Sequence, residues 1–298
     1  MGTVNSTPYE TPYEKRSVVS RDGTTIGYRQ MGSGPGLVLV HGGMQASQNL
    51  MKLATALAAE FTVCVLDRRG RGLSGPFGDD YGLQRECEDL QAVLLRTNTQ
   101  FVFGLSSGAL ICLQAALIVP EIRKAALYEP PLPVNSSSPA SWVDVFDAEI
   151  ARGDLGAALV TALKGTETSR VLGLIPRRIL VPLMRHAIRV ADPTRTMGDD
   201  VHPLALIPTM HYDAQLVREM EGRLEQFRDV AVEVLLLGGT RSPSYLRHAL
   251  DVLAGILPQC SRVKLSGVGH TAADNGGKPE LVARELRRFF GTPVVGVT

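Results

Sequence analysis

The sequence lacks several features that would point to particular classes of protein. Its 31 lysines and arginines and 30 aspartates and glutamates leave a formal net charge of +1. Nucleic-acid-binding domains usually carry a markedly basic face, so we expect no nucleic-acid partner. No apolar run is long enough to cross a bilayer, and the first residues have no apolar segment typical of a secretory signal peptide. We therefore expect a cytoplasmic protein without a membrane span.

Cysteine is scarce, and metal-binding or nucleotide-binding patterns are missing. The four cysteines are not spaced like a disulfide framework or a zinc site; they are Cys64, Cys87, Cys112 and Cys260. Cys64 and Cys112 lie inside apolar runs, which favours buried side chains. The glycines of the 32–36 segment precede a predicted strand and not a helix, so they do not form a dinucleotide-binding turn. The sequence therefore predicts no metal and no cofactor.

What the sequence does contain is an alternation of short apolar runs and helical stretches. The apolar runs predict strands at residues 36–40, 61–66, 101–103, 125–128, 232–237 and 262–265. The intervening stretches predict helices at residues 49–59, 82–96, 107–118, 244–257 and 279–290. Before them, two strand-like runs flank Asp22-Gly23, a hairpin signal. Strands that are apolar throughout are buried on both faces, so the sequence predicts an α/β protein with a mostly parallel sheet covered by helices.

The alternation stops between residues 133 and 229, where the apolar spacing is helical and no strand is indicated. Because the strand pattern resumes afterwards, we predict one core domain, residues 15–132 and 230–298, interrupted by a helical cap at 133–229. The cap would cover the carboxyl ends of the strands, where open α/β sheets bind ligands. Residues 1–14, which contain two TPYE copies, are predicted to be a flexible tail.

The segment Gly104-Leu105-Ser106-Ser107-Gly108 has the pattern G-x-S-x-G between a predicted strand and a predicted helix. In this context the serine sits at a sharp, strained turn that exposes its hydroxyl. The first N–H groups of the following helix point toward the place where an oxyanion would form. Ser106 is therefore the predicted nucleophile.

A serine hydroxyl is a weak nucleophile until a neighbouring base takes its proton. Histidine suits this task because its pKa lies near neutrality. His270 follows the last predicted strand in a glycine-flanked loop, which puts it at the same edge of the sheet as Ser106. His270 is therefore the predicted base.

Four segments, in this order, resemble the α/β-hydrolase superfamily: His41-Gly42-Gly43, the run from Asp67 to Ser74, the Ser106 turn and Gly269-His270. The resemblance covers roughly residues 15–132 and 230–290, and it implies the α/β-hydrolase fold with helices on both faces of the sheet.

The resemblance also implies roles for individual groups. The backbone N–H groups of Gly43 and Ser107 would form the oxyanion hole, and His41 would be a structural histidine behind the oxyanion loop. For the arginines of the 67–74 segment we expect a solvated structural loop.

The acid of the catalytic triad is the least defined member. Many relatives carry it in a G-x-x-D-P-like turn after the insertion, but here that turn has Ser242 in place of the aspartate. Other branches place the acid one strand earlier, where this sequence has Glu129. The order Ser106, Glu129, His270 keeps the sequence nucleophile, acid, base. We predict Glu129 as the acid, with Asp251 and Asp274 as alternatives.

The serine nucleophile excludes the dehalogenases and epoxide hydrolases of this fold, in which an aspartate stands at that position. The predicted reaction is hydrolysis of a carboxylic ester through an acyl-enzyme on Ser106. A lactone is the alternative substrate, because Gly-x-Ser-Ser-Gly-Ala and Tyr128-Glu129-Pro130 resemble the fungal zearalenone lactonases, which do not share the His-Gly-Gly loop. Amide, thioester and carbon–carbon hydrolysis, a slow-turnover ligand receptor and a lyase of the same fold stay open.

The cap is expected to set specificity for a small-molecule ester or lactone. Six residues are candidates for the lining of the pocket: Met44, Leu105, Trp142, Met210, His211 and Tyr212. Packing in a core is the alternative for each, since apolar residues at helical spacing usually face a core. The sequence leaves homodimerisation open.

Overall fold

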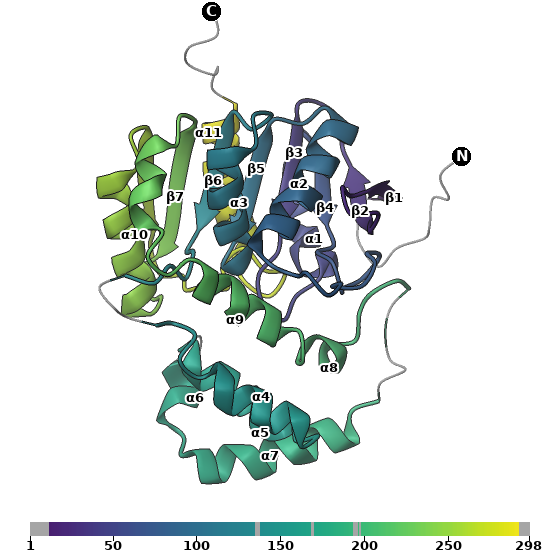
Figure 1. Ribbon diagram of the computed structural model, residues 1–298, viewed down its shortest axis with the longest axis vertical. Coiled ribbons are helices and arrows are strands. Elements are labelled where there is room, and N and C mark those ends of the chain that lie inside the picture. The colour runs from purple at the N-terminus through teal and green to yellow at the C-terminus, as the bar shows by residue number, and fades with distance from the viewer. Residues whose placement is uncertain (1–11, 135–137, 168–169, 193–195, 197, 292–298) are drawn as a thin grey trace, which may run out of the picture.

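The computed structural model describes residues 12–134, 138–167, 170–192, 196 and 198–291. Its strands form an eight-stranded sheet in the order β1-β2-β4-β3-β5-β6-β7-β8 within the described part of the chain (Figure 1). The strands are β1 (Glu14–Val19), β2 (Thr25–Met31), β3 (Gly36–Val40), β4 (Thr62–Leu66), β5 (Phe101–Leu105), β6 (Lys124–Tyr128), β7 (Glu233–Gly239) and β8 (Cys260–Leu265). Strand β2 pairs antiparallel with β1 and β4, and the remaining neighbours are parallel. The predicted mostly parallel sheet is confirmed.

Helices cover both faces of the sheet, because each central strand is apolar on both faces. In β3, Leu37 and Leu39 pack into one core cluster, whereas Val38 and Val40 pack into the other. This alternation follows from the two-residue period of a strand. The first cluster includes α1 (Met51–Leu57), which follows the short 3₁₀ helix η1 (Ser47–Leu50), and α11 (Pro279–Phe290). The second includes α2 (Leu83–Thr97), α3 (Ser107–Ile118) and α10 (Ser244–Ile256).

Within its described residues, the insertion between β6 and β7 contains helices joined by turns and loops, and no strand. Its elements are α4 (Val143–Ala151), α5 (Leu155–Gly165), α6 (Arg170–Leu174), α7 (Arg177–Val190), α8 (Pro203–Leu206), α9 (Met210–Glu219) and η2 (Leu224–Asp229). Figure 1 shows α4 to α7 as a separate layer beyond the carboxyl ends of the strands, with α9 between that layer and the core.

Helix α9 packs on α3, and its residues Ala214 and Val217 belong to the core cluster of the sheet. Helix α3 is accordingly buried along most of its length, between the sheet and α9. We propose that the cap corresponds to the 133–229 insertion, with α9 as the base that joins it to the core.

Residues 1–11 of the expected flexible tail lie outside the described residues, but Tyr13 is buried and Glu14 begins β1, so the tail does not extend to residue 14. Tyr13 packs in the core cluster of α1 and α11, and the guanidinium of Arg29 lies 5.0 Å from the centre of its ring. Cys64 and Cys112 are buried, as predicted. None of the described helices has the length and apolar character needed to cross a membrane.

Candidate active site

Ser106 occupies the sharp turn between β5 and α3. Its backbone has φ 55° and ψ −122°, a conformation that residues with a side chain rarely adopt. The flanking glycines allow the close approach that this turn requires: a Cβ on Gly104 would collide with the carbonyl oxygen of Gly108, and one on Gly108 would collide with that of Val40. Such strain, of order 1–3 kcal/mol, persists where surrounding packing enforces it, typically at functional sites.

His270 is oriented by Glu129. The Glu129 carboxylate is fully buried at the end of β6, and its Oε2 lies 2.7 Å from His270 Nδ1. Its other oxygen, Oε1, accepts a hydrogen bond from the backbone N–H of Gly239 at 2.6 Å. Because a carboxylate only accepts, Nδ1 carries the proton of the neutral imidazole and Nε2 is left as the acceptor. This is the tautomer that a general base needs in order to take a proton from serine.

The other candidates for the acid have different surroundings. Asp251 lies on α10 with its side chain largely exposed and pairs with Arg262. Asp274 lies in the loop after His270, but its Oδ1 accepts from Gln45 Nε2 at 2.7 Å. Ser242 is buried, and its hydroxyl has no hydrogen-bond partner among the described residues. Of these side chains and Glu129, the structure brings only Glu129 into hydrogen-bond contact with His270.

The loop after β3 lies beside the nucleophile turn. Gly43 lines the same cavity as Ser107, the first residue of α3. The first N–H groups of a helix have no acceptor within the helix, and the N–H of Gly43 has no acceptor among the described residues. A Cβ at Gly43 would lie 2.9 Å from the Met210 sulfur. A side chain at position 43 would therefore require Met210 to shift.

His41 supports this loop from behind. It is fully buried, its Nε2 accepts from the backbone N–H of Arg68 at 3.3 Å, and its Nδ1 lies 2.9 Å from the carbonyl oxygen of Gly42. Burial lowers the pKa of His41 well below its usual value, and the charges of Arg71 and Arg68 lower it further. His41 is therefore a neutral donor to Gly42, in keeping with the structural role that the resemblance implies.

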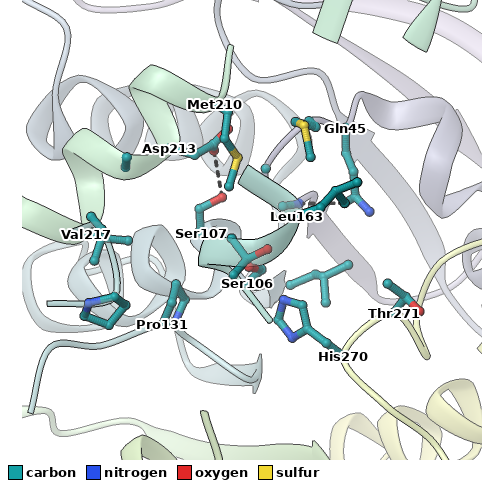
Figure 2. Close-up of a pocket in the computed structure, with 18 of the residues that line it drawn as sticks. Gln45, Ser106, Ser107, Pro131, Leu163, Met210, Asp213, Val217, His270 and Thr271 are labelled. Atoms are coloured by element: carbon teal, nitrogen blue, oxygen red, sulfur yellow. Dashed lines mark hydrogen bonds between the residues drawn. The ribbon is translucent and has the colours of Figure 1, made fainter. Parts of the chain in front are cut away.

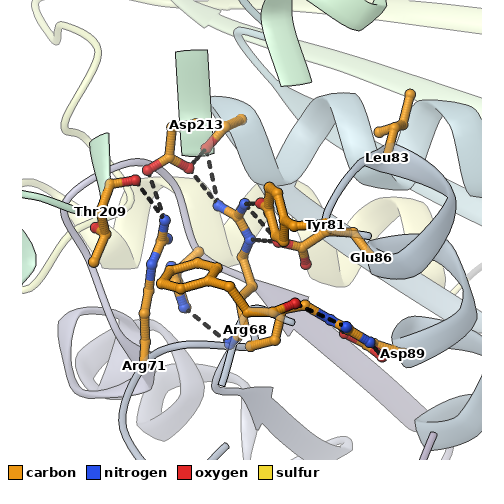
Figure 3. Close-up of polar contacts among 12 residues, drawn as sticks. Arg68, Arg71, Tyr81, Leu83, Glu86, Asp89, Thr209 and Asp213 are labelled. Carbon is orange, nitrogen blue, oxygen red and sulfur yellow. Dashed lines mark hydrogen bonds and ion pairs between the residues drawn. The ribbon is translucent and has the colours of Figure 1, made fainter. Parts of the chain in front are cut away.

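The prediction that the arginines of the 67–74 segment are solvated is wrong. Arg68, Arg69 and Arg71 are buried, and each guanidinium pairs with a buried carboxylate (Figure 3). The pairs are Arg68 with Glu86 at 2.7 Å, Arg68 with Asp213 at 2.7 Å, Arg69 with Asp89 at 2.6 Å and Arg71 with Asp213 at 2.7 Å. The physical reason is that α2 and α9 supply the opposite charges that a buried arginine requires.

Asp213 links this arginine cluster to the residue after the nucleophile. Its Oδ1 accepts from Ser107 Oγ at 2.8 Å and from Arg68, and its Oδ2 accepts from Arg71. Burial on its own would raise the pKa of Asp213, but the charges of Arg71 and Arg68 outweigh it and lower the pKa to about 2. Asp213 is therefore a permanently charged group at neutral pH. The sequence reasoning missed this residue.

A cavity of about 330 Å³ connects these groups (Figure 2). Ser106 and His270 line it, together with four of the six predicted pocket residues, Met44, Leu105, Trp142 and Met210. Sequence reasoning missed further lining residues, among them Pro131, Leu163, Val217, Tyr245 and Asp274.

The prediction that His211 and Tyr212 line the pocket is wrong. The ring of Tyr212 stacks on Phe77 with 3.5 Å between the ring centres, and His211 is exposed, with its Nδ1 2.9 Å from Asp147. Helical geometry explains the difference, because the cavity face of α9 carries Met210 and then the residues three, four and seven positions later: Asp213, Ala214 and Val217. Positions 211 and 212 fall on other faces.

Comparison with known proteins agrees with this geometry. Residues 37–285 match the model of a family described as the alpha/beta hydrolase family. An alpha/beta hydrolase from Sphaerobacter thermophilus DSM 20745 is 32% identical, and the match covers 92% of this chain and 100% of that chain with a TM-score of 0.75. The 2-(acetamidomethylene)succinate hydrolase of Mesorhizobium japonicum is 26% identical over 270 residues, which are 89% of this chain and 91% of the relative.

An esterase from Rhodococcus sp. ECU1013 shares the fold, with 21% identity, a TM-score of 0.64 and coverage of 93% of this chain and 98% of that one. Family match, fold and site geometry thus agree, and the chain belongs to the alpha/beta hydrolase family.

Proposed function

We propose that the protein is a serine hydrolase that cleaves a carboxylic ester through an acyl-enzyme on Ser106. The observation that carries the proposal is the combination of three groups at one sheet edge. Ser106 lies at a strained turn in the cavity wall, His270 lines the same cavity, and buried Glu129 fixes the tautomer of His270. Nucleophile, base and orienting acid are the parts that acyl transfer by a serine requires.

The reaction begins when Ser106 Oγ attacks the ester carbonyl while His270 Nε2 takes its proton. The oxygen of the tetrahedral intermediate becomes an anion between the N–H groups of Gly43 and Ser107, each worth roughly 3–4 kcal/mol in the transition state. His270 then gives its proton to the departing alcohol, which leaves the acyl group on Ser106. Water, deprotonated by His270, releases the acid in the same way. Glu129 stays ionised throughout and stabilises the imidazolium.

The relative from Mesorhizobium japonicum is named for hydrolysis of 2-(acetamidomethylene)succinate, a compound with two carboxylates. None of the described residues that line the cavity here is a lysine or an arginine. A dicarboxylate would therefore enter a cavity without a lysine or arginine partner among the described residues, and we do not propose that substrate for this chain. A lactone stays within the proposal as a cyclic ester, whose alcohol remains attached to the acyl group after ring opening.

The proposal is tested by hydrolysis of a p-nitrophenyl ester chain-length series and of a lactone. We expect turnover by the wild type, a loss of about 10⁴-fold or more in Ser106→Ala and a loss of about 10³–10⁴-fold in Glu129→Gln. Ser242→Ala is the matched control, a buried serine at the other acid position, and should keep the wild-type rate. Mass spectrometry with a slowly hydrolysed ester should detect an acyl adduct on the wild type that Ser106→Ala lacks.

Two outcomes contradict the proposal. Full activity of a folded Ser106→Ala variant would exclude the acyl-enzyme on this residue. A folded wild type without turnover of any ester or lactone would favour the alternative hypotheses, a slow-turnover ligand receptor or a lyase of the same fold.

A further inference from the structure

A carboxyl group that the proposed steps do not use lines the cavity near the reacting atoms. Asp274 lies shortly after His270 in the loop that follows β8, and both residues line the cavity. Its Oδ1 accepts a hydrogen bond from Gln45 Nε2 at 2.7 Å. No hydrogen-bond donor to its Oδ2 is present in the described part of the chain. Asp274 is thus a fixed carboxyl group with one oxygen that the protein does not occupy.

No lysine or arginine of the described residues forms an ion pair with Asp274. The buried arginines of this region, Arg68 and Arg71, are already paired with Asp213 and Glu86. Much of the remaining lining is apolar and includes Met44, Leu105, Trp142, Leu163 and Val217. In such a cavity the interaction between two charges is screened far less than in water. The charge of Asp274 therefore acts strongly on any charged group of a bound molecule.

Asp274 titrates close to neutrality. Burial raises its pKa to about 6, against the opposing effects of the Gln45 hydrogen bond and the charge of His270. The titratable groups that face it are His270 on its own loop and, at the end of β6, Tyr128 with the adjoining Glu129. From the loop after β3 the contacting side chain is the neutral Gln45. At position 274 the cavity wall therefore carries a carboxylate above about pH 6 and a neutral carboxyl group below it.

Resting on the ester hydrolysis proposed above, we propose that Asp274 selects the substrate. The protein takes esters whose groups beside the ester bond are uncharged or cationic. It discriminates against esters that place a carboxylate there, because two like charges would lie within a few ångströms in a weakly screened site. Asp274 is in this sense a specificity-determining residue and not a member of the triad.

The test uses three p-nitrophenyl esters of similar length: the valerate, the glutarate monoester and the 4-(trimethylammonio)butyrate. At pH 8 the wild type should prefer the valerate to the glutarate by about tenfold or more in kcat/KM, and should hydrolyse the cationic ester at least as well as the valerate. Asp274→Asn keeps an oxygen that can accept from Gln45 but removes the charge. It should bring the valerate-to-glutarate ratio of kcat/KM within about threefold.

Asp251→Asn is the matched control, because Asp251 lies on α10 outside the lining of the cavity. This variant should keep the wild-type ratio. A ratio that Asp274→Asn leaves at the wild-type value overturns the proposal.

A second measurement needs the wild type alone. The glutarate-to-valerate ratio of kcat/KM cancels pH effects on catalysis that both substrates share, and should rise as the pH falls from 8 to 5.5. A ratio that stays flat over this range overturns the proposal as well.

The two proposals fail in different ways. Activity of Ser106→Ala on the valerate contradicts the proposed function. If Ser106→Ala is inactive and Asp274→Asn loses as much valerate hydrolysis as Ser106→Ala, the proposed function stands. Asp274 is then part of the catalytic machinery, and its role as a specificity-determining residue is overturned.

Discussion

Asp213 and Asp274 are two carboxyl groups that are linked to the same residue, Gly42, through Arg71 and Gln45. Asp213 lies on α9 of the insertion and pairs with Arg71, whose guanidinium lies 3.4 Å from the carbonyl oxygen of Gly42. Asp274 lies in a loop of the core and binds Gln45, which accepts from the N–H of Gly42 at 2.8 Å. Their pKa values are shifted in opposite directions, to about 2 and to about 6.

The difference between them is set by their partners. Both are removed from water, which opposes the charged form. Two buried arginines more than compensate for this at Asp213, whereas a neutral amide is the main partner of Asp274. Asp213 is thus a structural charge that stays ionised at neutral pH. Asp274, the same residue type, titrates near neutrality and is open to a ligand.

The same substitution at both positions should have opposite effects on stability. Asp213→Asn removes the only carboxylate paired with Arg71 among the described residues and should lower the free energy of unfolding by about 3–5 kcal/mol, because a buried charge loses its partner. Asp274→Asn should raise it by about 3 kcal/mol at pH 7.5, because it removes the charge whose burial raises the pKa of Asp274 to about 6. Urea unfolding measures both. Equal losses at the two positions would contradict the comparison.

The pH dependence of stability should separate the two carboxyls further. The folded-state pKa of Asp213 lies below the ordinary value near 3.9, so its contribution is complete above about pH 4 and is lost as the pH falls toward 2. The difference between Asp213→Asn and the wild type should therefore shrink below pH 4. The folded-state pKa of Asp274 lies above the ordinary value, so the cost of its charge is absent below about pH 4 and complete above pH 6.

Unfolding free energies measured from pH 3 to 8 test this prediction. The advantage of Asp274→Asn over the wild type should grow between pH 4 and pH 6 and then stay constant. An advantage that is independent of pH would show that the charge of Asp274 is not its source.

The comparison also explains which parts of the site could be predicted from the sequence. Ser106, Glu129 and His270 each follow a predicted strand, and the carboxyl ends of parallel strands meet at one edge of a sheet. Chain order and strand ends therefore suffice to bring these three residues to one edge. The roles of Arg68 and Asp213 depend instead on how α9 packs against α3, and contacts between segments more than a hundred residues apart leave no local spacing to read.

One signal in the insertion was nevertheless available. If Met210 faces the cavity, helical geometry places Asp213, Ala214 and Val217 on the same face. The same argument excludes His211 and Tyr212. For the arginines, charged residues in a loop are usually exposed, and a single sequence does not reveal the buried carboxylates that reverse this expectation.

The smallest expected effect concerns two sets of contacts that hold the loop after β3 and the nucleophile turn. The insertion contact joins Asp213 to Ser107, and the core contact joins Asp274 through Gln45 to Gly42. Ser107→Ala removes the hydroxyl that donates to Asp213, and Gln45→Met removes the side chain that joins Gly42 to Asp274. Both variants keep the backbone N–H groups of Gly43 and Ser107, so each should lower kcat by about tenfold or less, well below the loss of a whole donor. KM should change little, because the interaction weakened is made in the transition state. Loss of kcat in Ser107→Ala but not in Gln45→Met would mean that the insertion contact alone positions the two backbone N–H groups. The reverse result would mean that the core contact alone positions them.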